Sequence, residues 1–199
     1  MSHLAIDPDT KGSGVALIGK RKGSGYVLAA GCAYDHGLSA KKKKTALLTW
    51  QLEKVQEVIL QAWAIAREED DPIERVTVEG QQAYSKSRVD PNGLLKLALV
   101  SGAAMLAGTR IGCPVTLVLP RDWKGQQSKV ATWRRVLRWV EWEWFETRPR
   151  SRGEQPRVEF SIPTHVKILG SIPISHRKEV LDALALGQWS LNHRHRKHE

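Results

Sequence analysis

Residues 3–18 read HLAIDPDTKGSGVALI, and this stretch decides how the whole chain is interpreted. Two apolar runs, 4–6 and 15–18, predict two strands joined by a loop longer than a tight two-residue turn. The loop carries the turn residues Pro8, Gly12 and Gly14. Asp7 closes the first strand, where a carboxylate is costly to bury unless a cation or hydrogen bonds meet it. On residue type alone, Asp7 is either a turn-forming residue or a metal ligand.

The composition indicates one globular domain with a polyanionic partner. The chain has 199 residues, of which 41% are hydrophobic, and this is enough for one domain with a substantial core. The 31 Lys and Arg residues outnumber the 21 Asp and Glu residues, and the net charge of +10 favours nucleic acid as the partner over a merely basic soluble protein. We expect one domain over residues 1–191 and a basic, disordered tail over residues 192–199.

The lack of a recognisable targeting signal, together with the cysteine usage, favours a cytoplasmic location. No apolar run reaches the length of a membrane span, and no basic-then-apolar signal segment opens the sequence. Cys32 and Cys113 lie in apolar surroundings and form no spaced metal motif. We therefore expect both to be buried free thiols in a reducing compartment.

Strand and helix patterns alternate after the opening stretch. Further strands are expected at residues 26–32, 75–79 and 113–119. Helices are expected at residues 45–67, 93–109, 126–146 and 176–191, the last with Ser175 as its N-cap. Loops are expected at residues 120–125 and 147–157, and a short strand or irregular segment at 158–162. This order predicts an α/β fold, a mixed five-stranded sheet with helices on both faces.

Four carboxylates fall where this arrangement would bring them together. Asp7 and Glu79 each close a strand, and Glu179 and Asp182 lie three residues apart on one face of the last helix. Four converging acids repel one another unless divalent cations neutralise them. Oxygen-rich clusters suit Mg²⁺ or Mn²⁺, and two such ions can activate water and stabilise the leaving oxygen in phosphodiester cleavage. Taken singly, each acid also fits a surface residue, although Asp182 lies within the apolar run 180–186.

Several motifs resemble the RuvC-type Holliday-junction resolvases of the RNase H-like superfamily. They are IDPDT at residues 6–10 with Gly14, VE at 78–79, EVLDALA at 179–185, the helix stretch 95–102, and residues 120–129 leading into a helix. The resemblance covers residues 3–135 and 175–190. It implies an RNase H-like fold and a homodimeric, Mg²⁺-dependent endodeoxyribonuclease of DNA recombination and repair. Such an enzyme nicks two strands of a four-way DNA junction symmetrically.

The resemblance assigns roles to the four acids. They become the catalytic and metal-binding set for two ions per active site, with Asp7 contacting both ions, Glu79 and Asp182 one each, and Glu179 completing the shell or orienting water. His176, one turn before Glu179, either contacts the scissile phosphate, assists proton transfer, or is a capping or exposed side chain. The chain departs from the family at Asp9, where a small residue is usual, and at Glu179, where Asp is usual. Residues 133–157 extend beyond the usual core.

Basic and aromatic side chains around these acids are candidates for DNA contact. The candidates are Lys41, Lys42, Lys43, Lys44, Lys86, Arg88, Arg121, Lys124 and Lys129 for phosphates. Tyr84 is the candidate that wedges between bases, or else a packing residue. Trp123 either stacks on a base or anchors its loop, and Trp133 and Trp144 are expected to be core or dimer contacts.

Three other functions stay open. Another RNase H-like nuclease, or an integrase-like strand transferase, would share the acids and differ in substrate. An actin-like or sugar-kinase ATPase domain also begins with an acidic-turn hairpin, but the chain is too short for paired domains and Asp182 is left unexplained. A non-catalytic DNA-binding module would have no use for four converging acids.

Overall fold

Strand β1 (Ser2–Asp7) is buried along its whole length and lies between two neighbours at the centre of the sheet. It pairs antiparallel with β2 (Gly12–Arg21), which pairs antiparallel with β3 (Ser24–Tyr34). On its other side it pairs parallel with β4 (Ile73–Glu79), and β4 pairs parallel with β5 (Val115–Val118). The computed structural model describes residues 1–10, 12–22, 24–34, 44–81, 90–124, 127–147, 156–172 and 174–193, with only the backbone described at 44–47 and 174.

The predicted α/β fold with a mixed sheet is therefore confirmed, and the sheet has one strand more than the sequence pattern predicts. Within the described residues the sheet has six strands in the order β5-β4-β1-β2-β3-β8. The additional strand, β8 (Lys167–Gly170), pairs parallel with β3 at the edge of the sheet. It is short and only one of its residues is buried, so it carries little of the alternation that marks a strand.

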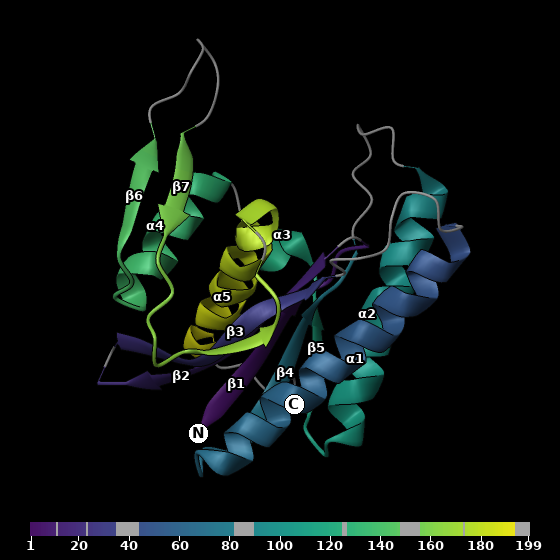
Figure 1. Cartoon of the computed structure of the whole chain (residues 1–199), viewed down its shortest axis with the longest axis horizontal. Coiled ribbons are helices and arrows are strands. Elements are labelled where there is room, and N and C mark those ends of the chain that lie inside the picture. The colour runs from purple at the N-terminus through teal and green to yellow at the C-terminus, as the bar shows by residue number, and fades with distance from the viewer. Residues whose placement is uncertain are drawn as a thin grey trace.

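Helices cover both faces of this sheet, as expected (Figure 1). One face packs against α1 (Lys44–Glu68) and α2 (Pro91–Arg110). The other packs against α5 (Arg177–Asn192) and α4 (Lys129–Trp139). Successive side chains of a strand point to opposite faces, so Leu4 and Ile6 enter the core under α1 and α2 while Ala5 enters the core under α5.

Small residues let α5 approach the sheet closely. A Cβ added to Gly14 of β2 would lie 2.0 Å from the carbonyl oxygen of Glu179, which is backbone and cannot move aside cheaply. A Cβ added to Gly187 of α5 would lie 2.3 Å from Cδ1 of Ile18. Gly14 thus allows the first turn of α5 to approach the opening hairpin, and Gly187 does the same further along the helix. These close contacts place the acids of the helix.

The expected helix at 126–146 is wrong in its second half. Helix α4 ends at Trp139, and the chain turns at Glu141, whose φ is 57°. Residues beyond the turn form β6 (Trp144–Thr147), which pairs antiparallel with β7 (Arg157–Phe160) in a separate two-stranded sheet. Trp144 therefore lies in a strand. Trp142 is buried and stacks on Phe160 at 5.7 Å between ring centroids, so tertiary packing outweighs the helical spacing of the aromatic residues.

Smaller corrections concern the ends of elements. Residues expected as a loop contain the short helix α3 (Pro120–Trp123). Ser175 is not the N-cap of α5, because a 3₁₀ turn, η1 (Ile174–His176), precedes the helix and His176 occupies the cap position. Cys32 is a buried free thiol as expected, whereas Cys113 is only partly buried and donates to the carbonyl of Ile73 at 3.2 Å.

Several expectations fall outside the described residues. They concern Lys41, Lys42 and Lys43, the side chain of Lys44, Tyr84, Lys86, Arg88, the loop at 148–155 and the tail from residue 194. In the part of the chain that the structure describes, α2 is long and apolar enough to span a membrane by length and composition alone, a test that core helices also pass.

Candidate active site

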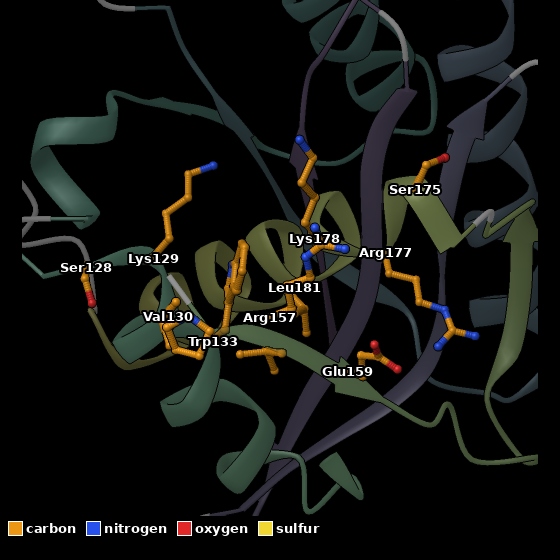
Figure 2. Close-up of a pocket in the computed structure, with 12 residues that line it drawn as sticks. Ser128, Lys129, Val130, Trp133, Arg157, Glu159, Ser175, Arg177, Lys178 and Leu181 are labelled. Atoms are coloured by element: carbon orange, nitrogen blue, oxygen red, sulfur yellow. The ribbon is translucent and has the colours of Figure 1, made fainter. Parts of the chain in front are cut away.

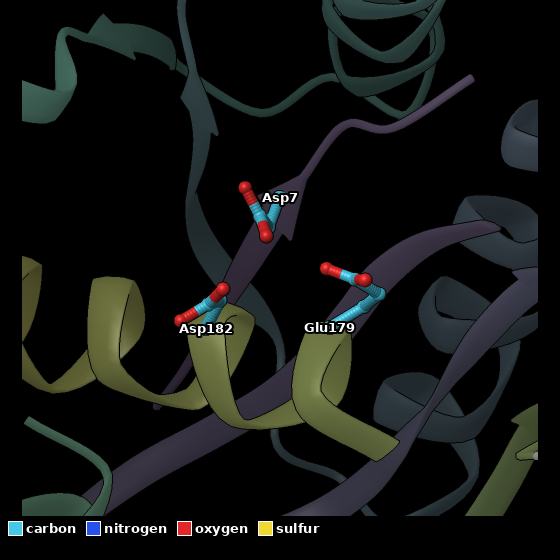
Figure 3. Close-up of side chains that lie close together, drawn as sticks. All are labelled: Asp7, Glu179 and Asp182. Atoms are coloured by element: carbon cyan, nitrogen blue, oxygen red, sulfur yellow. The ribbon is translucent and has the colours of Figure 1, made fainter. Parts of the chain in front are cut away.

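Three carboxylates converge at the carboxyl end of β1. Asp7 extends from the strand end, and Glu179 and Asp182, three residues apart on the first two turns of α5, point toward it (Figure 3). One oxygen of each side chain lies within 4.8 Å of the others. The exposed fractions are 8% for Asp7, 9% for Glu179 and 2% for Asp182, so the three charges face one another with little water between them.

Glu79 lies beside this cluster. Strand β4 runs parallel to β1 with Val78 opposite Ile6, so Asp7 and Glu79 end neighbouring strands at one edge. The carboxylate of Glu79 accepts hydrogen bonds from the indole of Trp123 at 3.1 Å and from Nζ of Lys124 at 2.9 Å. The predicted meeting of Asp7 with Glu79 is thus observed, but Glu79 is turned toward α3 and is not one of the three converging side chains.

Asp182 has a matching pair of partners from α4. Nζ of Lys129 lies 2.9 Å from Oδ2, and the indole nitrogen of Trp133 donates to Oδ1 at 2.8 Å. The two carboxylates Glu79 and Asp182 are therefore each held by one lysine and one tryptophan. Both pairs come from the segment that follows β5, which lies over the carboxyl edge of the sheet.

Burial and neighbouring charges shift the pKa values of two acids and two lysines in the site. Burial raises the pKa of Asp7 well above its usual range, and the charges of Glu79 and Asp182 raise it further. Burial also raises the pKa of Glu179. Burial alone would lower the pKa of Lys124 and Lys129, but the surrounding carboxylates outweigh it and raise both pKa values. Both lysines therefore stay charged and partly compensate the acids.

The donor set fits a hard divalent cation. Every convergent group is a carboxylate, one oxygen of each lies within 4.8 Å of the others, and burial raises the pKa of Asp7, so that a bound cation would favour its ionised form. Mg²⁺ and Mn²⁺ prefer such oxygen ligands, and sulfur or imidazole ligands are not part of this described cluster. Asp7, Glu179 and Asp182 are therefore the side chains that would hold an ion, with Glu79 within reach of the same edge.

Comparison with known proteins shows which known fold the chain shares. No family model matches the chain, and no curated protein matches it. Among solved structures, RuvC of T. thermophilus in complex with a Holliday junction substrate superimposes with a TM-score of 0.61 at 18% identity, covering 94% of this chain and 90% of that chain. This chain has the RuvC fold. A second structure of RuvC from Thermus thermophilus gives a TM-score of 0.56 at 18% identity, covering 94% of this chain and 91% of that one.

The yeast mitochondrial Holliday junction resolvase Ydc2 shares the RuvC fold as well. It superimposes with a TM-score of 0.51 at 10% identity, covering 94% of this chain and 76% of that chain. The fold implied by the sequence motifs is thereby confirmed. At these identities the structural likeness establishes the fold, and the chemistry has to be argued from the side chains of this chain.

The remaining predicted residues lie around the acids of this RuvC fold. His176 packs against Tyr34 with 4.1 Å between ring centroids, and its Nδ1 lies 2.8 Å from the hydroxyl of Ser175. Asp9 belongs to the turn, where its backbone N–H and carbonyl both bond to the hydroxyl of Ser13 at 3.1 Å. Arg121 is exposed at the start of α3 and lies 3.6 Å from Asp122.

The sequence pattern missed the roles of Trp123 and Trp133. The sequence contained a signal for one of them, because Trp133 follows Lys129 by one helical turn and so shares its face of the helix. Trp123 is adjacent to Lys124, and this spacing alone predicts no common partner. In the structure each tryptophan reaches the same carboxylate as its neighbouring lysine. Their indole N–H groups fix the orientation of Glu79 and Asp182 in this RuvC fold.

Under the nuclease function proposed below, a Trp133→Phe variant is expected to lower the cleavage rate by about 10-fold to 100-fold, because a hydrogen bond to a charged group contributes about 1.5–3 kcal/mol. The ring is kept, so the melting temperature should change little. Initial cleavage rates at saturating Mg²⁺ measure the effect. Trp139→Phe, the same chemical change at the other end of α4, is the matched control; equal rates for both variants would contradict a role for the indole N–H.

Proposed function

We propose that the protein is a divalent-metal-dependent endodeoxyribonuclease that resolves four-way DNA junctions by paired symmetric nicks. The observation that carries this proposal is the convergence of Asp7, Glu179 and Asp182, with Glu79 alongside, at the carboxyl edge of a RuvC fold. The name of the yeast protein and the bound substrate of T. thermophilus RuvC agree with it. Such a protein would act in recombination and repair in the cytoplasm, where its DNA substrate lies.

In this proposal Asp7, Glu79, Glu179 and Asp182 would hold two Mg²⁺ or Mn²⁺ ions. Bound ions of this kind supply an activated water and neutralise charge on the leaving oxygen. Asp182 keeps its orientation because the indole of Trp133 donates to one of its oxygens. Lys124 and Lys129 stay protonated beside the acids and attract the scissile phosphate.

The same edge carries the charge that would attract DNA. Lys129 is exposed and Lys124 partly exposed beside the acids that they contact, and Arg121 is exposed at the start of α3. Lys41 to Lys44, Lys86 and Arg88 are proposed as further phosphate contacts, and Tyr84 as the wedge between bases at the junction centre. A surface of this kind predicts binding that weakens steeply with salt.

Incubation with a synthetic four-way junction and Mg²⁺ tests the proposal. Products separated on a denaturing gel should show nicks at symmetric positions in two opposing strands, and EDTA should abolish them. Linear duplex, a replication fork and an RNA–DNA hybrid serve as competing substrates. Preferential cutting of the hybrid would favour another RNase H-like nuclease, and binding with no metal-dependent nicking would favour a non-catalytic module.

Paired nicks require two active sites, and α2 offers the surface for a homodimer. The inner face of α2 packs on the sheet through Val100, Ala104 and Ala107. Its outer face carries Leu95, Leu99 and Leu106, which are 61%, 45% and 48% exposed. Gly102 lies between them and has open space around it. Exposed leucines at helical spacing form an apolar stripe that a second copy of the chain would cover.

Leu99→Glu is therefore expected to weaken the dimer by about 100-fold in its dissociation constant, because two leucines lose their burial in a symmetric contact and two charges enter it. Sedimentation velocity over a concentration series measures the change, and the variant should cut single strands instead of opposing pairs. Ile168→Glu, an exposed residue on β8 at the opposite edge of the sheet, is the control. An unchanged dimer with Leu99→Glu would place the interface elsewhere.

A further inference from the structure

A cleft opens directly beside the acidic cluster, between α4, β7 and the start of α5 (Figure 2). Its volume is about 750 Å³, which lies within the range of pockets that bind small organic groups. The predicted role of the aromatic α4 segment as core or dimer contact does not account for this cleft. One of its walls, β7, belongs to the hairpin that the sequence pattern did not predict.

The apolar part of the lining consists of Val130, Trp133, Val158 and Leu181. Trp133 is only half-buried, and its indole nitrogen is fixed on Asp182 at 2.8 Å. The ring therefore has a set orientation before any ligand enters, and ordering it costs little on binding. A fixed aromatic ring with aliphatic neighbours is a surface on which a nucleobase can stack.

The charged part of the lining favours phosphate. Among the described residues that line the cleft, Lys129, Arg157, Arg177 and Lys178 are cationic and Glu159 is the one acid. The guanidinium of Arg177 is anchored, since its Nη1 donates to the carbonyl of Phe160 at 3.1 Å. An apolar lining under a cationic border is complementary to a nucleotide, which combines a flat base with an anionic phosphate.

The cleft and the acidic cluster share walls. Lys129 lines the cleft and bonds Asp182 at 2.9 Å, and Lys178 lines it and lies 3.4 Å from Oε1 of Glu179. Trp133 contributes its ring to the cleft and its N–H to Asp182. A nucleotide in the cleft is therefore adjacent to any phosphate bound at the acids.

We propose that this cleft binds one unstacked nucleotide of the cleaved strand, immediately next to the scissile phosphate. Its base packs on Trp133, and its phosphate contacts Arg157 and Lys178. The inference rests on the proposed nuclease function and adds to it a binding site for the flanking nucleotide, formed by α4, β7 and the start of α5.

Photo-crosslinking tests the contact itself, independently of its effect on the cleavage rate. The nick is first mapped with wild-type protein, and 5-iodo-2′-deoxyuridine then replaces the nucleotide on either side of it. After irradiation in EDTA, digestion with trypsin should yield the nucleotide attached to the peptide Val130–Arg134, whose aromatic residue is Trp133. Cross-links confined to other peptides would overturn the proposal.

Cleavage kinetics provide the second arm. An abasic site in place of the flanking nucleotide should lower the rate by about tenfold, which corresponds to one lost base–aromatic stack. Val158→Trp, which fills the cleft with an apolar ring, should lower the rate on the intact junction similarly and remove the effect of the abasic site. Arg157→Ala should also slow cleavage. Arg135→Ala removes an equal charge from an exposed position of α4 outside the cleft and should cut like wild type.

The outcomes separate the two proposals. A wild-type protein that cuts no junction overturns both the nuclease function and the cleft. If wild type and Val158→Trp both cut intact and abasic junctions at the same, normal rate, the nuclease function stands and nucleotide binding in the cleft is overturned.

Discussion

An Asp7→Asn variant is expected to bind four-way junctions as tightly as wild type and to cut them at least about 10³-fold more slowly, since metal ligation contributes several kcal/mol to such a transition state. Asp7 neighbours Glu79 on one side and the α5 carboxylates on the other, so its loss removes the acid that we propose as the shared ligand. Single-turnover cleavage rates and gel-shift titrations in Ca²⁺ measure the two quantities separately.

The exchange also removes a charge from a crowded, buried site. Burial and the neighbouring carboxylates already raise the pKa of Asp7, so the amide should leave the ion-free protein at least as stable as wild type. Asp9→Asn is the control, because Asp9 is a neighbouring carboxylate whose backbone belongs to the turn. Full cleavage by Asp7→Asn, or equal losses in both variants, would contradict the assignment of Asp7 as the shared ligand.

Addition of Mg²⁺ or Mn²⁺ at about 100 times its dissociation constant should stabilise the protein by about 2.7 kcal/mol. For a chain of this length such a gain raises the melting temperature by about 5–10 °C. Differential scanning calorimetry with and without the ion measures it. The Asp7→Asn variant should lose most of the gain, which ties the thermal effect to the acidic cluster.

The size of that gain should depend on pH, with a definite sign. The pKa of Asp7 is higher in the folded chain than in the unfolded one, so the folded state holds more protons between the two values. The stability of the ion-free protein therefore falls as pH rises through this window. A bound cation needs ionised Asp7, so its stabilising effect should grow as the pH rises through the same window. A gain that shrinks as pH rises would contradict the assigned ligands.

The sequence predicts the sheet and its acids well because both follow from local patterns. The apolar runs around Asp7 and Glu79 are short, buried and bounded by turn residues, so their ends could be located from the chain alone. Parallel neighbours then end at one edge, and the spacing of Glu179 and Asp182 puts both on one face of a helix. These steps use one element at a time.

The segment after β5 could not be predicted in the same way. The tryptophans between residues 133 and 144 repeat at helical spacing, yet Trp142 is buried against Phe160, which lies far along the chain. The turn at Glu141 and the β6–β7 pairing depend on that distant contact. The indole bonds of Trp123 and Trp133 likewise require knowing where α3 and α4 lie over the sheet. β8 was missed because a short edge strand has little pattern of its own.

The acids and the side chains that contact them come from different parts of the fold. The carboxylates stand on β1, β4 and α5, which are packed into the sheet and its helical layer, whereas their lysine and tryptophan partners stand on α3 and α4. Helix α4 also borders the cleft and is followed along the chain by the β6–β7 hairpin. Within that segment Val130 lines the cleft, whereas Lys129 and Trp133 hold Asp182. A change at Val130 would therefore reshape the cleft and leave the hydrogen bonds to Asp182 in place. The fold therefore carries the carboxylates and the side chains that orient them on separate elements, and the orienting side chains of α4 also form part of the cleft.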